Sequence, residues 1–81
     1  MGWNRINDNF GCAYWKAVEN GYDVAFLLFM PEPENADRWM VCVGSGGTVE
    51  DAYDCPMLQY LTNAMPRQDA EAYLQAYIRE N

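Results

Sequence analysis

An unbroken run of apolar residues near the middle of the chain constrains the fold more than any other feature. Residues 24–30 read Val-Ala-Phe-Leu-Leu-Phe-Met, with the pair Asn20-Gly21 shortly before them and Pro31 directly after them. A short apolar run bounded by turn-forming residues is typical of a strand that is buried on both faces. The run is far too short to cross a bilayer. We therefore predict a strand over residues 22–30.

The segment before Asn20-Gly21 has two interpretations. Asn-Gly between two apolar stretches favours a two-residue β-hairpin, because both residue types tolerate a positive φ. The hairpin would place three cross-strand pairs on one wholly apolar face: Ala17 with Val24, Trp15 with Phe26 and Ala13 with Leu28. The alternative is a helix over residues 8–20, capped by Asp8 and ended by Gly21, which fits the i, i+3, i+4 spacing of the apolar residues. We prefer the hairpin, and the sequence leaves the helix open.

The second half of the chain predicts one more strand followed by helices. Along residues 38–43, Trp39, Val41 and Val43 would point to one face of a strand, and Met40 and Cys42 to the other. The seven residues 31–37 that join this strand to the preceding one suit an antiparallel pair. After a glycine-rich turn at residues 44–47, helical spacing runs over residues 49–64, with Thr48 and Asp51 as an imperfect capping box. Pro56 predicts a kink or a new start there, capped by Asp54. A last helix is predicted over residues 67–80.

This order of elements predicts a single α+β domain over residues 1–81. The expected architecture is a small antiparallel sheet of two to three strands, with the C-terminal helices packed on one face.

The charges and the missing histidine restrict the chemistry. Twelve acidic residues oppose five basic ones, for a formal net charge of −7. This balance argues against direct contact with nucleic acid or an anionic membrane, because phosphate groups need clustered Lys and Arg. The absence of histidine removes the commonest general base and the commonest zinc ligand. We therefore expect no enzymatic activity, no cofactor and no metal site.

The cysteines and the N-terminal residues bear on the cellular compartment. Cys12, Cys42 and Cys55 are odd in number, and no two of them have the C-x-x-C spacing of a zinc ribbon or redox motif. The N-terminal residues contain no apolar stretch of the signal-peptide type. These features predict a reducing, cytoplasmic environment.

Five carboxylates are the candidate partner-binding residues: Glu19, Asp23, Glu50, Asp51 and Asp54. In the hairpin interpretation the glycine-rich turn returns to the Asn20-Gly21 end of the sheet, so these side chains can gather at that end. No Lys or Arg occurs between Trp39 and Pro66 to neutralise them. A dense acidic patch attracts a basic surface, and we therefore expect another protein with a basic surface as the partner.

Two functions follow from these features. In size and charge the chain is similar to small acidic inhibitors from phages and mobile elements, including anti-CRISPR and anti-restriction proteins, although no motif carries that similarity. It would then be a non-enzymatic module that occupies a basic nucleic-acid-binding surface. The alternative is a structural or accessory homodimer, in which Tyr14, Leu27 and Phe29 on a sheet face left uncovered by helices meet a second copy.

Overall fold

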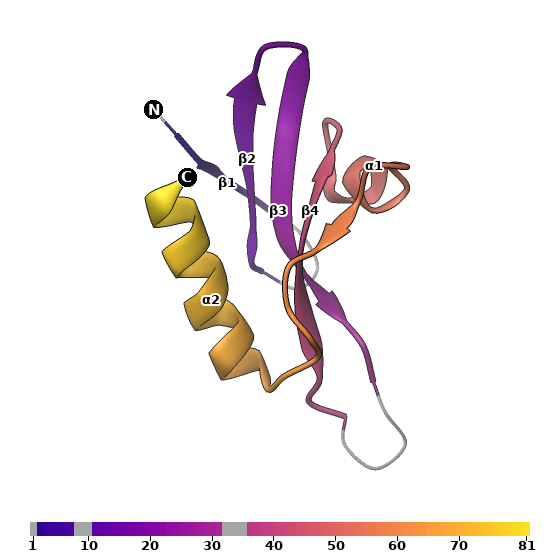
Figure 1. The fold of residues 1–81 in the computed structure, drawn as a ribbon, viewed down its shortest axis with the longest axis vertical. Coiled ribbons are helices and arrows are strands. Elements are labelled where there is room, and N and C mark those ends of the chain that lie inside the picture. The colour runs from indigo at the N-terminus through magenta and orange to yellow at the C-terminus, as the bar shows by residue number, and fades with distance from the viewer. Residues whose placement is uncertain (1, 8–10, 32–35) are drawn as a thin grey trace.

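The computed structural model describes residues 2–7, 11–31 and 36–81, which form one antiparallel sheet and two helices. The strands lie in the sheet in the order of the sequence (Figure 1): β1 (Asn4–Ile6), β2 (Ala13–Val18), β3 (Gly21–Phe29), β4 (Trp39–Ser45) and β5 (Gln59–Tyr60). Helix α1 (Val49–Tyr53) connects β4 to β5, and helix α2 (Arg67–Glu80) follows β5. The predicted α+β class is confirmed. The predicted count of two to three strands is wrong, because the described residues form five.

The hairpin before residue 30 is confirmed, with a different register. Residues 13–18 pair with β3, so the alternative helix is wrong there, and its residues 8–10 lie outside the described part. Trp15 pairs with Val24 instead of Phe26, because the two-residue turn is Glu19-Asn20 and Gly21 already pairs with Val18. Among the described residues only glycines have a positive φ, and Gly21 has a φ of +146°. The hairpin thereby avoids the left-handed Asn20 that a type I′ turn would need. The displacement by two positions keeps every side chain on its predicted face.

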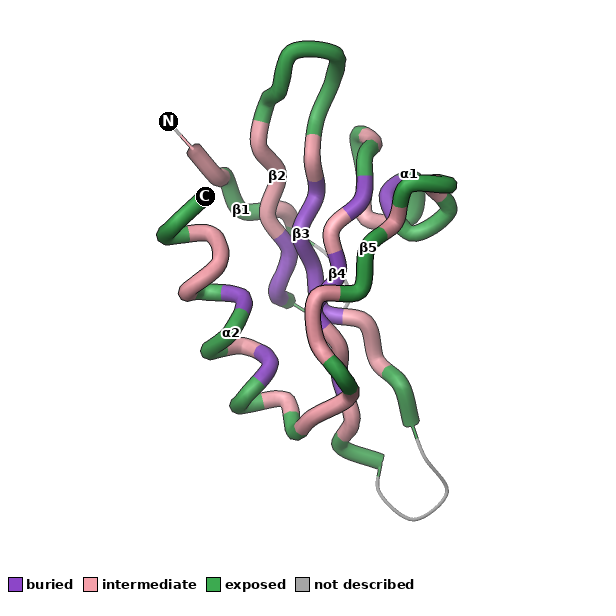
Figure 2. Tube along the Cα trace, in the orientation of Figure 1, coloured by how far each residue is buried: buried purple, intermediate pink, exposed green. Residues whose placement is uncertain are grey.

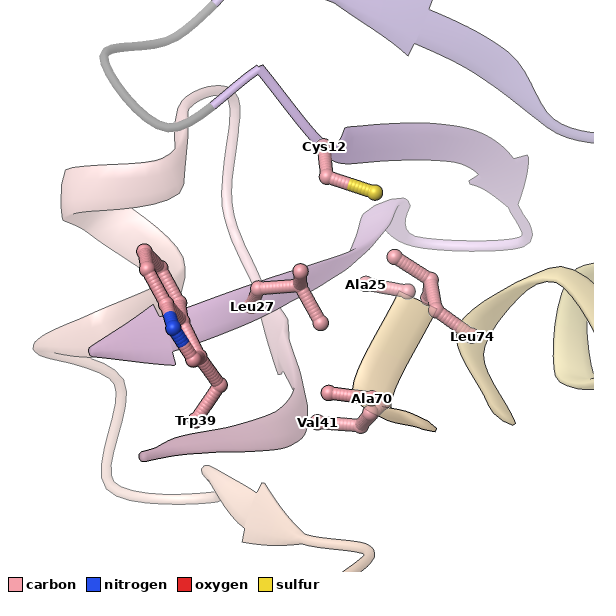
Figure 3. Close-up of a cluster of buried hydrophobic side chains, with 7 residues drawn as sticks. All are labelled: Cys12, Ala25, Leu27, Trp39, Val41, Ala70 and Leu74. Carbon is pink, nitrogen blue, oxygen red and sulfur yellow. The ribbon is translucent and has the colours of Figure 1, made fainter. Parts of the chain in front are cut away.

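Strand β3 is buried on both faces of the sheet. On one face, Ala25 and Leu27 lie against Ala70 and Leu74 of α2, in the cluster shown in Figure 3. On the other face, Phe26 belongs to a second cluster, whose remaining buried members are Ala13, Val24, Cys42 and Ala52. Leu27, Leu74 and Phe26 are each at most 1% exposed. The apolar run therefore forms the centre of two cores, as a strand with two apolar faces requires.

The two helices lie on opposite faces of the sheet, which corrects the prediction that the helices share one face. Helix α2 covers the face of Leu27, whereas Ala52 of α1 packs on the face of Phe26. The helix predicted over residues 49–64 ends at residue 53, and Asp54 is its C-cap rather than a new N-cap. Pro56 cannot continue the hydrogen-bonded ladder of a helix. The chain is instead extended at β5, which pairs with β4.

The Asp37 carboxylate ties the start of β4 to the start of α2. Pro66, at the N-cap position of α2, makes no side-chain cap hydrogen bond. The Arg67 backbone N–H instead donates to Asp37 Oδ1 at 3.1 Å, and the Trp39 indole Nε1–H donates to the same oxygen at 3.1 Å. Asp37 therefore serves α2 as an N-terminal cap that is distant in sequence.

Replacing Asp37 by alanine is expected to lower the free energy of unfolding by about 1–2 kcal/mol, the usual cost of losing an N-terminal cap. Asp37→Asn retains a side-chain oxygen acceptor and is expected to lose a smaller part of this stability. Urea denaturation followed by tryptophan fluorescence measures both changes. Equal stability of Asp37→Ala and the unmodified chain would show that the carboxylate does not cap α2.

Candidate functional site

Helix α1 and its C-cap residue carry three exposed carboxylates. The Asp51 backbone N–H donates to Thr48 Oγ1 at 3.1 Å, so the predicted Thr48 cap is present. Ala52 is fully buried against the sheet, whereas Glu50, Asp51 and Asp54 are exposed. Figure 2 shows that most of the chain around α1 is exposed. We call Glu50, Asp51 and Asp54 together the α1 acidic surface.

Two glycines of the β4–α1 connection allow α1 to lie directly on the sheet. A Cβ atom at Gly44 would lie 2.2 Å from the main-chain oxygen of Ala52, and a Cβ atom at Gly46 would lie 2.6 Å from the Asp51 Cβ. Real Cβ atoms do not approach other atoms this closely. Gly46 also has a φ of +156°, a conformation that favours glycine. These glycines therefore fix the position of the α1 acidic surface relative to β4.

The tip of the β2–β3 hairpin lies beside the same glycines. The Gly46 N–H donates to the main-chain oxygen of Tyr22 at 3.1 Å. An open pocket of about 450 Å³ is lined by the hairpin tip, with Val18 and Tyr22, and by residues 45–47. A second pocket, of about 290 Å³, is lined by Trp15, Tyr22 and Gly47, and we call it the aromatic–glycine pocket. The predicted approach of the glycine-rich turn to the hairpin is thus present.

The five predicted site residues do not all lie together. Glu19 forms part of the exposed hairpin turn, at the end of the sheet where β4 finishes, and the α1 acidic surface lies on the α1 face of that end. Asp23 shares the opposite face with Ala25 and is the register partner of Lys16. Asp23 is also close enough to α2 to raise the pKa of the Tyr77 phenol, after the larger effect of burial. The structure therefore separates Asp23 from the other four residues.

The basic side chains lie away from the α1 acidic surface. Arg5 pairs in register with Tyr14, and Lys16 donates to the main-chain oxygen of Asn81, so both are on the α2 face. Arg67 and Arg79 belong to α2 itself. Arg38 precedes β4, at the strand end opposite the glycine-rich turn. Among residues 2–7, 11–31 and 36–81, no ion pair neutralises the α1 acidic surface.

The sheet face expected to meet a second copy is covered by α2. Leu27 is 1% exposed beneath α2, and Gln75 Nε2 donates to the Tyr14 hydroxyl at 2.8 Å. The rings of Phe29 and Trp39 lie 4.8 Å apart. These three residues thus make their contacts within the chain. The face that they share is covered by α2 and does not lie open to a second copy.

The sequence analysis did not identify Trp15 as a residue that lines a pocket at this end of the molecule. Its ring meets that of Tyr22 edge to face, with centroids 5.3 Å apart. Tyr22 is 47% exposed. The sequence signal for this pair was the alternation along the hairpin, since Trp15 and Tyr22 lie on one face whichever of the two registers forms.

The chemistry of this end is that of a negatively charged surface beside an aromatic pocket. In the part of the chain that the structure describes, no three Cys, Asp or Glu side chains group closely enough to hold a metal ion.

The two described helices are too short or too polar to span a bilayer. Comparison with protein families, curated proteins and solved structures found no match to this chain.

Proposed function

We propose that the chain is a small, acidic, non-enzymatic protein-binding module that occupies a basic surface on another protein. That basic surface would be one that normally binds nucleic acid, so this chain would act as an inhibitor of the anti-CRISPR or anti-restriction type. The observation that carries the proposal is the segregation of the described basic side chains away from the α1 acidic surface; acidic residues such as Asp23 and Asp69 occur on the α2 face as well. The α1 acidic surface lies on one face, while Arg5, Lys16 and the arginines of α2 lie on the other.

This segregation matters because opposite charges within the chain would weaken the attraction for a partner. Each carboxylate of the α1 acidic surface is exposed, so water screens it until a partner excludes that water. The field of several like charges on one face speeds and orients the approach of a basic protein. The proposed contact therefore involves Glu50, Asp51, Asp54 and, at the hairpin turn, Glu19.

The same proposal includes a reducing, cytoplasmic environment and no catalysis. Cys12 and Cys42 are buried, and Cys55 is half-buried. Burial raises the pKa of the Cys42 thiol from 9.0 to about 11. Since the thiolate is the reactive form, Cys42 is a poor nucleophile near neutral pH. With no histidine in the sequence, no imidazole is present to activate any of the three thiols.

Charge reversal on α1 tests the proposal. The double variant Glu50→Lys/Asp51→Lys is expected to weaken capture of the partner from a lysate of the source cell by about 100-fold or more, because like charges at an interface cost several kcal/mol. The control is Asp69→Lys/Glu80→Lys on α2, which changes the net charge equally on another element. Capture is measured by quantitative mass spectrometry at low and high salt.

The proposal requires a protein that the unmodified chain and the α2 control both capture, and that the α1 variant and high salt both release. A partner captured equally by the α1 and α2 variants would contradict it, because binding would then depend at most on net charge. A partner retained unchanged at high salt would contradict it as well.

A homodimer remains the second candidate, now through the α1 side of the sheet. Met57 is 73% exposed and Tyr60 is 54% exposed, and Tyr60 pairs with Cys42, which lies on the α1 face. Light scattering of the unmodified chain separates the candidates. A monomer at micromolar concentration would remove this one.

A further inference from the structure

We propose that the aromatic–glycine pocket binds the side chain of an arginine residue that belongs to the partner protein. This inference rests on the proposed function, since it names the chemical group that the acidic end of the molecule would recognise. It adds a specific receptor to a charged surface that would otherwise attract any basic protein.

The size and the lining of the pocket suit a guanidinium group. The rings of Trp15 and Tyr22 meet edge to face, at an interplanar angle of 90°, and both residues line the pocket. Gly47 completes the lining without a side chain. The volume of about 290 Å³ exceeds that of a single guanidinium head with its methylene stem. A planar guanidinium stacks on aromatic faces and is more weakly hydrated than an ammonium group, which favours arginine over lysine.

One acidic residue of α1, Asp51, lies beside the glycine-rich connection that contributes to this pocket. The Asp51 Cβ fills the space into which a Gly46 side chain would project, and Gly46 precedes the pocket residue Gly47 in the chain. The Gly46 N–H donates to the main-chain oxygen of Tyr22, which holds the β4–α1 connection against the pocket wall. A cation in the pocket would thus lie among aromatic side chains and within the field of the neighbouring Asp51 charge. An anionic group would be repelled there.

The other two tryptophans show how this chain pairs its rings with cations. The Lys16 ammonium lies 5.7 Å from the centre of a Trp3 ring, and the Arg67 guanidinium carbon lies 4.5 Å from the centre of a Trp39 ring. Across the described residues, no basic side chain of the chain itself stacks on Trp15. Trp15 is therefore the tryptophan whose cation would come from a partner.

The test uses two small probes, acetyl-arginine-amide and its neutral isostere acetyl-citrulline-amide. The indole N–H resonances of Trp3, Trp15 and Trp39 are followed by NMR during titration. We expect saturable, millimolar binding of the arginine probe that moves the Trp15 resonance most, and no such change with citrulline. Tyr22→Ala is expected to weaken binding about tenfold, within the range of a cation–π contact. Asp51→Asn should also weaken it, whereas the control Tyr73→Ala, at a similarly exposed tyrosine of α2, should not.

Equal responses to arginine and citrulline would overturn the inference, as would equal shifts at all three tryptophans. The partner assay separates this failure from failure of the proposed function. If Glu50→Lys/Asp51→Lys abolishes capture and Tyr22→Ala leaves it unchanged, the acidic surface binds the partner and the arginine pocket is wrong. If neither variant changes capture, both proposals are wrong.

Discussion

Phe26→Ala is expected to lower the free energy of unfolding by about 3–5 kcal/mol, the largest loss from a single truncation in this chain. Phe26 is 1% exposed and is the largest of the fully buried side chains among the described residues. It fills the core between the sheet and α1, together with Val24, Cys42 and Ala52. Urea denaturation measures the change.

A small domain has a modest total stability, so a graded series keeps this prediction testable. Phe26→Leu removes less volume than Phe26→Ala and is expected to lose a smaller part of this stability. Tyr53→Ala, at a residue that is 48% exposed, should change stability by no more than about 0.5 kcal/mol. Two results together would contradict this account of the core on the α1 face. Phe26→Leu would have the same free energy of unfolding as Tyr53→Ala, and Phe26→Ala would lose less than about 1 kcal/mol.

Gly44→Ala is expected to have the second-largest effect, and to affect stability and partner binding together. The added methyl group would meet the Ala52 main-chain oxygen at 2.2 Å, and a main-chain atom cannot move away unless α1 moves. Overpacking of this kind costs about 1–3 kcal/mol. Displacement of α1 would also move the α1 acidic surface, so partner capture should fall. Denaturation and capture are measured on the same preparation.

Gly47→Ala is the matched control for stability. A Cβ atom at Gly47 meets nothing within 4 Å, and Gly47 has no positive φ. Its stability should therefore equal that of the unmodified chain, within about 0.5 kcal/mol. Equal stability of Gly44→Ala and Gly47→Ala would contradict the close packing of α1 on β4.

The elements with long, regular patterns could be predicted from the sequence. Helix α2 has the predicted bounds, residues 67–80, because Ala70 and Leu74 lie on one stripe that the sheet buries. Strands β3 and β4 lie within a few residues of their predicted positions. The Thr48 cap was also predictable, since it depends on residues three positions apart.

Elements that depend on distant contacts could not be predicted. Strand β5 has two residues and forms only because β4 offers an edge beside it. The choice of face by α2 was equally hidden, because both faces of β3 are apolar and the sequence does not distinguish them. The cap that Asp37 gives to α2 joins residues 30 positions apart.

The candidate site divides in the same way. Grouping of Glu50, Asp51 and Asp54 follows from their closeness in sequence. Asp23 lies at the predicted end of the sheet, but it shares the face of Ala25, whereas α1 packs on the face of Phe26. The approach of Tyr22 to Gly46 was predictable from the hairpin, but the aromatic–glycine pocket depends on the positions of three segments.

Competition with nucleic acid tests the central claim most directly. The protein recovered in the capture experiment is purified, and its affinity for its own nucleic acid is measured with and without this chain. We predict that the chain displaces the nucleic acid, that it does so less well as salt rises, and that Glu50→Lys/Asp51→Lys does not displace it. A stable complex that holds the partner, the nucleic acid and this chain together would contradict the claim that the α1 acidic surface occupies the nucleic-acid site.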